Sequence, residues 1–284
     1  MSDRRRALSP LRAALTALLV AGAALACGET ATQVGEGDVV DLRITPDTGR
    51  IATGWTLQMR AFPLDESQAF LPGVAVTWST SNPDVATVDE NGLATGVADG
   101  SAEITATAAG LSAPAVVSVE PPPVIVPDRD SVAFAMEAGG TDPAPDSVDV
   151  TNGGAFPLED LEVDTIVYSG AVDGWLTAQF TSSDAPSVLA LTPIAGGLTT
   201  AGTLTATVWL TGTAADSVPV TAVLQVGPAA ASSAQVTDGD GQSAVAGTAV
   251  PVPPAVRVTD AFGNPVPSIQ VTFAVTDGGG SVTG

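Results

Sequence analysis

The sequence contains no histidine and no lysine, and each absence removes a class of chemistry. Without histidine, a Ser-His-Asp or Cys-His catalytic arrangement and the commonest transition-metal ligand are excluded. Without lysine, a P-loop and Schiff-base chemistry are excluded. Paired carboxylates support glycoside hydrolysis in other proteins, but acids scattered through turns single out no pair here. We therefore expect a protein that is not an enzyme, with no cofactor and no catalytic or metal site.

Positive charge is also scarce. The formal net charge is −22, from 31 acidic and nine basic residues, and all nine basic residues are arginine. Beyond residue 27 there are five of them: Arg43, Arg50, Arg60, Arg129 and Arg257. Phosphate contacts need clustered cations, so we expect no nucleic-acid partner. The acids are spread along the chain, which favours a role in solubility.

Calcium binding is the alternative role for acidic residues, and one short acidic loop, Asp238-Gly239-Asp240-Gly241, is the candidate for it. Its carboxylates resemble the start of a calcium-binding loop. It lacks the remaining ligands and the closing glutamate of an EF-hand loop. Calcium binding and a plain turn are therefore both open at this loop, and the sequence favours the turn.

The only cysteine, Cys27, ends a basic and then apolar N-terminal segment. Arginines at positions 4, 5, 6 and 12 precede an apolar run from Ala13 to Ala26, which is the order of an export signal. The run is shorter than the ~20 residues that a membrane-spanning helix needs. The sequence therefore predicts a signal helix over residues 1–26 rather than a membrane span.

The residues before the cysteine, Ala23-Ala24-Leu25-Ala26-Cys27, resemble the lipobox of bacterial lipoproteins. The resemblance implies that Cys27 is diacylated and becomes the mature N-terminus, with residues 27–37 as a flexible tether to the membrane. Gly28, in place of aspartate, implies the outer membrane and the cell surface in a cell with two membranes. The alternative is an ordinary cleaved signal in which Cys27 is incidental.

The rest of the chain is apolar but poor in aromatic residues, with 45% hydrophobic and 4% aromatic residues, 30 glycines and 22 prolines. Several segments alternate apolar and polar residues with a period of two, which predicts strands with one buried face. Turn signals separate them, and this pattern is typical of sandwiches. The fold class that we predict is all-β, with tandem Ig-like β-sandwiches. The alternating segments are 55–61, 74–78, 204–210 and 269–275.

Two breaks divide the chain into three parts. Proline runs form semi-rigid spacers, and Pro121-Pro122-Pro123 follows a predicted strand. A stretch of small residues then follows a second predicted strand. The expected domains are residues 38–120, 128–227 and 234–284, joined by linkers at 121–127 and 228–233.

The first part resembles the bacterial Ig-like group 2 domain. The matching residues include Trp78-Ser79-Thr80-Ser81-Asn82-Pro83-Asp84, Asn91-Gly92-Leu93-Ala94-Thr95-Gly96 and Ile104-Thr105-Ala106-Thr107. The similarity extends from about Val39 to Val119. Because Trp78 alternates with two valines, we expect it to fill the core between two sheets rather than to serve as an exposed sugar platform.

The second part resembles BACON-like Ig-type domains of bacterial surface proteins. The cues are 132–134, 148–154, Trp175-Leu176 and 201–208. Some relatives lie beside carbohydrate-active domains, which implies glycan contact through exposed tryptophans. The candidates are Trp175, after Asp173-Gly174, and Trp209, on the polar side of its strand. The alternative is that each packs at a sandwich end or under a loop.

The third part resembles the bacterial Ig-like group 1 domain of invasin and intimin-type adhesins. The matching residues are 240–242, 247–248, 256–266, 269–275 and 278–282. These cover about half of a usual ~100-residue sandwich, so we expect an incomplete last sandwich and a longer protein.

Two functions from different classes follow from these patterns. The first is a lipid-anchored stalk or adhesin on the cell surface, whose partners are the membrane and surface or matrix glycans or proteins. The second is the non-catalytic, glycan-binding leader region of a larger enzyme that acts on surface polysaccharide. The gene sequence beyond residue 284 would distinguish them, because further Ig-like repeats favour the first and a hydrolase-like segment favours the second.

Overall fold

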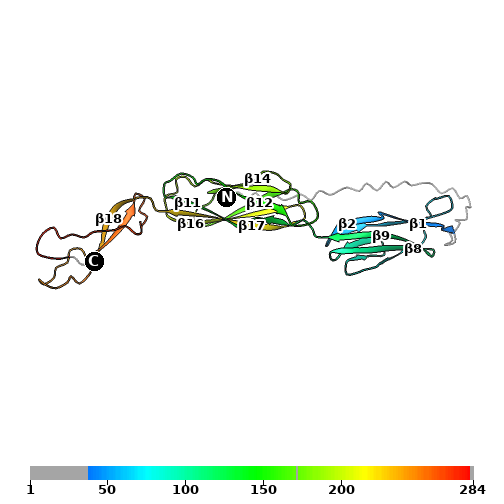
Figure 1. Cartoon of the computed structure of the whole chain (residues 1–284), viewed down its shortest axis with the longest axis horizontal. Coiled ribbons are helices and arrows are strands. Elements are labelled where there is room, and N and C mark those ends of the chain that lie inside the picture. The colour runs from blue at the N-terminus through cyan, green and yellow to red at the C-terminus, as the bar shows by residue number, and fades with distance from the viewer. Residues whose placement is uncertain (1–37, 171, 282–284) are drawn as a thin grey trace, which may run out of the picture.

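The computed structural model describes residues 38–170 and 172–281, and its regular elements are nineteen β-strands. Figure 1 shows three bodies arranged in a row along the chain, and the first two are β-sandwiches. The predicted signal segment, Cys27 and the tether at 27–37 lie outside the described residues. Within the described part of the chain, no helix is long and apolar enough to cross a membrane. The all-β prediction with tandem sandwiches is confirmed.

The first module, residues 38–120, contains nine strands in three sheets. A four-stranded sheet has the order β2-β9-β8-β5, a three-stranded sheet the order β3-β7-β6, and β1 pairs with β4. The strands are β1 (Asp41–Thr45), β2 (Thr48–Ala52), β3 (Thr56–Gln58), β4 (Arg60–Leu64), β5 (Thr77–Thr80), β6 (Ala86–Val88), β7 (Leu93–Gly96), β8 (Gly100–Ala108) and β9 (Leu111–Glu120).

The core of this module lies between the four-stranded sheet and the two smaller sheets. Ile104 and Val117 of the large sheet pack with Ala94 of the three-stranded sheet. Farther along the large sheet, Ala106 packs with Leu42 of β1. The alternating residues of β8 and β9 therefore each bury one face, as the period of two predicts.

The predicted single strand over residues 55–61 is divided between two sheets. β3 belongs to the three-stranded sheet and β4 pairs with β1. Between them, Met59 is fully buried and its N–H donates to the Gly92 carbonyl at 2.9 Å. The alternation predicted the buried position of Met59, but Trp55 on the same predicted face is exposed, and a period of two does not report a change of sheet.

The second module, residues 125–227, has eight strands in two four-stranded sheets. Their orders are β10-β12-β15-β14 and β11-β17-β16-β13. The strands are β10 (Ile125–Pro127), β11 (Ser131–Glu137), β12 (Asp146–Asn152), β13 (Glu162–Ser169), β14 (Leu176–Phe180), β15 (Ser187–Pro193), β16 (Gly202–Gly212) and β17 (Ala215–Gly227).

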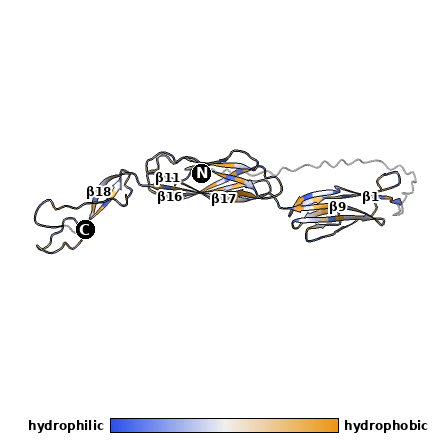
Figure 2. Ribbon diagram, in the orientation of Figure 1, coloured by the Kyte–Doolittle hydropathy of each residue, from blue (hydrophilic) through white to orange (hydrophobic). Residues whose placement is uncertain are grey.

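One hydrophobic cluster joins both sheets of the second module. It includes Val148 and Leu189 from one sheet and Val208 and Leu224 from the other, all fully buried. In Figure 2 hydrophobic and hydrophilic residues both occur along the strands of the two sandwiches. The predicted strand at 204–210 lies in β16, where Ala206, Val208 and Leu210 face the core.

Both modules begin with the same topological device. In the first module, β1 pairs antiparallel with β4, and β2 then pairs parallel with β9. In the second module, β10 pairs antiparallel with β12, and β11 then pairs parallel with β17. The first two strands of each module thus belong to different sheets, so the start of each module connects its two layers.

The expected linker at 121–127 is shorter than the sequence predicted. Residues 125–127 form β10, and Ile125 is buried in the core of the second module. The reason is that Ile125 lies between two exposed valines, Val124 and Val126, and this local alternation suits a strand. The second expected linker, 228–233, likewise ends early, because β18 begins at Ala231.

The third segment, residues 228–281, contains one antiparallel pair, β18 (Ala231–Asp238) and β19 (Ala255–Asp260). The predicted strand over 269–275 does not form among the described residues. Its four apolar residues, Ile269, Val271, Phe273 and Val275, are exposed. A strand needs a pairing partner and a covered apolar face, and this stretch has neither in the described chain.

Candidate functional site

The first module is joined to the second by a side-chain cluster around Arg50 on β2. The Arg50 guanidinium donates to both carboxylate oxygens of Glu120, with Nε–Oε1 at 2.8 Å and Nη2–Oε2 at 2.5 Å. The same Nη2 donates to the Ala155 carbonyl of the second module at 2.7 Å. Arg50 therefore links the last residue of β9 to a loop of the next module.

Aromatic rings extend this first joint. The Arg50 Cζ atom lies 4.6 Å from the centroid of the Phe156 ring, within cation–π range. Trp55 of the first module also contacts Phe156, with the ring centroids 5.0 Å apart and the planes tilted by 46°. Phe156 is thus held by a cation and an aromatic ring that both belong to the preceding module.

The backbone also approaches closely at this joint. The Ala155 N–H donates to the Pro121 carbonyl at 3.1 Å. A Cβ atom on Gly154 would overlap the Pro122 carbonyl, so only glycine fits that position. The hydrogen bonds from Arg50 hold the pKa of Glu120 below its ordinary value and raise the pKa of Arg50. Both groups are therefore charged over the neutral pH range.

A second joint connects the second module to the third segment through Asp260 and Asn264. The Asn264 side chain accepts from the Ala201 N–H at 2.9 Å and donates to the Thr199 carbonyl at 2.7 Å. Asp260 is 2% exposed and accepts from the Ala229 N–H at 2.9 Å. The ring of Phe262 covers Gly139, where a Cβ atom would overlap it. The Asn264 side chain thus bonds the backbone of the second module, and Asp260 holds both Asn264 and the start of the third segment in place.

The Asp260 carboxylate is stabilised in its charged form despite its burial. Burial raises its pKa, but hydrogen bonds from Asn264, Ala229 and Phe262 outweigh that effect and hold the pKa below the ordinary aspartate value. The carboxylate also accepts from the Asn264 N–H at 2.8 Å. A charged, fully bonded aspartate therefore organises the second joint.

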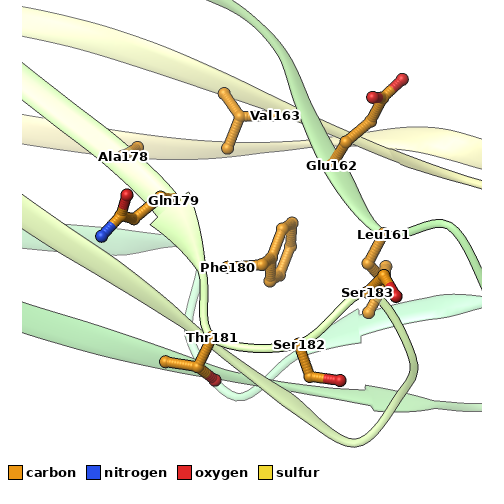
Figure 3. Close-up of a pocket in the computed structure, with 9 residues that line it drawn as sticks. All are labelled: Leu161, Glu162, Val163, Ala178, Gln179, Phe180, Thr181, Ser182 and Ser183. Carbon is orange, nitrogen blue, oxygen red and sulfur yellow. The ribbon is translucent and has the colours of Figure 1, made fainter.

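Besides the joints, each sandwich has an open groove between the edge strands of two of its sheets. The groove of the second module has a volume of about 450 Å³ and lies between β13 and β14. Figure 3 shows the Phe180 ring pointing into the space between the strands, with Glu162 pointing away from it. Leu161 and Val163 line the β13 side.

The hydroxyl groups beside this groove form hydrogen bonds within the turn that carries them. Ser183 Oγ donates to the Asp184 carboxylate at 3.3 Å, and Ser182 Oγ accepts from the Asp184 N–H at 3.2 Å. Thr181 Oγ1 accepts from the Val188 N–H at 3.3 Å. These bonds close the turn between β14 and β15. Because the hydroxyl groups are used within the turn, we interpret this groove as the gap between two packed sheets rather than as a binding site.

The groove of the first module has a different lining. It has a volume of about 380 Å³ and lies between β4 and β5, beside the turn at Glu90-Asn91. Three aromatic side chains line it, namely Phe62, Phe70 and Trp78. We call it the aromatic groove. Of its residues, the sequence pointed only to Trp78 as an alternative sugar platform and favoured the core for it, because the aromatic residues lie on different strands and loops and form no local motif.

The structure corrects one predicted site residue and leaves another open. Trp175 is 1% exposed and packs in the core of the second module, so its ring has no free face for a sugar. Trp209 lies half-buried on the outer face of β16, opposite Thr165 and Pro219. Trp78 is half-buried and packs against both core clusters of the first module. Cys27 lies outside the described residues.

The acidic loop at 238–241 forms local turn contacts. The Asp238 carboxylate accepts from the Gly239 N–H, and the Asp240 carboxylate accepts from the Gly241 N–H. Among residues 38–170 and 172–281, no group of three or more acidic, histidine or cysteine side chains is placed to hold a metal ion.

The family comparison concerns the first module. Residues 38–118 match the bacterial Ig-like domain (group 2). Ice-binding protein 1 of Shewanella frigidimarina (strain NCIMB 400) is 33% identical over 205 residues, which cover 64% of this chain and 22% of that protein. An A type blood N-acetyl-alpha-D-galactosamine deacetylase of Flavonifractor plautii is 37% identical over 111 residues, 37% of this chain and 14% of that protein. The chain thus spans less than a quarter of either relative.

Similar solved structures include tandem-domain proteins. Domains 1–6 of the surface layer protein SbsC are 19% identical, with coverage of 81% of this chain and 32% of that chain and a TM-score of 0.31. The Yersinia pseudotuberculosis adhesin InvE is 14% identical, with coverage of 73% and 67% and a TM-score of 0.26. Likenesses at this level of identity concern the fold alone. The family match over residues 38–118 by itself confirms the resemblance of the first module to the group 2 Ig-like domain.

Proposed function

We propose that this chain is a lipid-anchored stalk on the cell surface, in which tandem sandwiches hold a more distal part of the protein away from the membrane. The observation that carries the proposal is the arrangement of the sandwiches in a row, with bonded contacts at both joints (Figure 1). A spacer needs this property, because freely hinged modules would fold back on the membrane. The high negative charge supports the same role, since it repels anionic lipid headgroups.

The joint at Arg50 provides a direct test of stiffness. We expect the double variant Arg50→Ala/Phe156→Ala to keep both sandwiches folded but to bend between them, because the ion pair, the bond to Ala155 and the aromatic contacts are lost together. Small-angle X-ray scattering of the whole chain should show a shorter average maximum dimension and a broader distance distribution than for the wild type.

A matched control is available inside the second module. Arg129 forms an ion pair with Asp146 at 2.7 Å, with exposure similar to that of the Arg50 pair, but both partners belong to one sandwich. Arg129→Ala removes a cation without touching a joint, so its scattering curve should match the wild type. Equal scattering from the double variant and the wild type would contradict the rigid-stalk proposal.

The anchor is tested at Cys27. An acyl chain contributes ~0.8 kcal/mol per buried CH₂, and stable anchoring takes two signals, which a diacylated cysteine supplies. In cells fed a clickable palmitate analogue, the wild-type protein should carry label and fractionate with membranes. The variant Cys27→Ser should lose the label and be released. Equal labelling of the two proteins would rule out the lipid anchor and leave the ordinary cleaved signal.

A second candidate function is the non-catalytic leader of a larger enzyme that acts on surface glycans. The similarity of 111 residues to a sugar deacetylase favours it, although the chain covers only 14% of that protein. The gene sequence downstream of codon 284 separates the two candidates. Further Ig-like repeats support the stalk, and a segment similar to the rest of the deacetylase supports the leader.

A further inference from the structure

The aromatic groove of the first module presents an exposed ring, that of Phe70, which lies outside the hydrophobic core. Phe70 is 53% exposed, and its ring meets that of Phe62 edge-on, with centroids 5.9 Å apart and planes at 71°. Trp78 forms a further wall, and its own ring rests on Gly92. The groove therefore offers aromatic surface at a position open to solvent, within the volume range of small-ligand sites.

The loop that carries Phe70 is held in place by hydrogen bonds. Asp65 Oδ1 accepts from the backbone N–H groups of Ser67 and Ala69 at 2.8 and 2.9 Å, and from the Ser67 hydroxyl at 2.7 Å. Phe70 itself bridges back to Leu64 at the end of β4. The exposed ring is thus positioned in advance, which lowers the entropic cost of binding.

Two charged side chains beside these rings have no hydrogen-bond or ion-pair partner among the described residues. Arg60 and Glu90 line the groove and are exposed, and neither side chain makes a hydrogen bond or ion pair with any described residue. By contrast, Arg43, Arg50 and Arg129 all have carboxylate partners. A free guanidinium, which only donates, and a free carboxylate, which only accepts, therefore lie at one aromatic surface.

We propose that the aromatic groove binds a pyranose unit of a neutral glycan. The apolar C–H face of the sugar would lie on Phe70, and its hydroxyl groups would accept from Arg60 and donate to Glu90. Hydroxyl groups both donate and accept, so a sugar satisfies the two charged groups together. An apolar peptide side chain would cover the rings but leave both charges without a partner. This proposal is independent of the lipid anchor and of the stiffness of the stalk.

The test uses the whole chain and a panel of soluble neutral oligosaccharides, namely cellohexaose, xylohexaose, mannohexaose, laminarihexaose and chitohexaose. Binding is followed by saturation-transfer NMR and by the shift of the Trp78 indole N–H signal. At least one sugar should bind and move that signal. Phe70→Ala and Arg60→Ala should each weaken its binding about tenfold, the loss expected for one aromatic or one charged contact.

Matched controls separate binding from folding. Val167→Ala removes an apolar side chain of the same 53% exposure from the second module, and Arg257→Ala removes another exposed arginine whose side chain makes no hydrogen bond or ion pair with a described residue. Both controls should bind the sugar as the wild type does. The two groove variants and the two controls should all keep the wild-type melting temperature within about two degrees. Any larger fall for Phe70→Ala would be resolved with Phe70→Leu, which keeps the apolar contact of the loop but lacks the flat ring and should still lose binding.

Three outcomes would overturn the proposal. One is the absence of binding to every sugar in the panel. Another is sugar binding that is unchanged in Phe70→Ala and Arg60→Ala. The last is binding of a capped peptide of alternating valine and threonine, with a shift of the Trp78 signal, in the absence of binding to any sugar. This result would show that the groove adds a peptide strand instead.

Discussion

Trp175→Ala should unfold the second module at a temperature where the first module is still intact. The side chain is 1% exposed and lies in the cluster that joins both sheets. Its ring lies 6.3 Å from that of Tyr168, whose hydroxyl donates to the Leu176 carbonyl at 2.7 Å. Truncating a buried tryptophan costs about 3–5 kcal/mol, against a typical domain stability of about 5–15 kcal/mol.

Differential scanning calorimetry of the whole chain measures this effect, because two sandwiches with separate cores should give separable transitions. Trp209→Ala is the control, since it removes the same side chain from the half-buried outer face of β16. Trp175→Phe should retain most of the stability. It keeps an aromatic ring and removes an indole N–H that has no hydrogen-bond partner in the described chain. If Trp175→Ala and Trp209→Ala cost the same, the core position assigned to Trp175 is wrong.

Gly92→Ala should destabilise the first module far more than Gly110→Ala, although both glycines have nearly the same backbone conformation. Their φ angles are +80° and +77°, and a side chain at such an angle costs about 1–2 kcal/mol. A Cβ atom on Gly92 would also lie 2.6 Å from the Trp78 ring and 2.8 Å from the Met59 carbonyl, whereas nothing lies within 4 Å of one on Gly110. The overlap should add about 1–3 kcal/mol.

Chemical denaturation followed by tryptophan fluorescence compares the two variants with the wild type. The Gly110→Ala result measures the backbone cost alone, and the difference between the variants measures the packing cost at the Trp78 ring and the Met59 carbonyl. Equal losses would mean that the Trp78 ring moves freely away from Gly92. The position of Trp78 as a wall between the core and the aromatic groove would then lose its support.

Local patterns predicted some of the strands and turns of this protein, although the predicted segment 74–78 is a strand only from Thr77 onward. The alternation of Ala206, Val208 and Leu210 is that of β16, and all three side chains are buried. The Asn91-Gly92 pair predicts a tight turn, and Gly92 has the positive φ that such a turn uses. These features depend on neighbours in sequence, so a single chain without structure is enough to recognise them.

Predictions that depended on a distant partner were less successful. For Trp175, after Asp173-Gly174, the sequence left glycan contact and packing within the sandwich both open, and only the tertiary structure, which buries the ring, decides between them. The segment at 269–275 has the right alternation for a strand but has no neighbouring strand in the described residues, and it stays exposed. Alternation identifies which face of a strand is apolar, but it does not identify what covers that face.

The sequence by itself determined the all-β class, the division into successive modules and the absence of histidine and lysine chemistry, because these follow from composition and from local alternation. Only the tertiary structure decided the joints and the aromatic groove. Arg50 meets Ala155 and Phe156 across more than a hundred residues, and Arg60, Phe70 and Glu90 come together from separate segments. Such contacts depend on how strands are ordered in sheets and how sheets pack, and no local pattern in the chain carries that information.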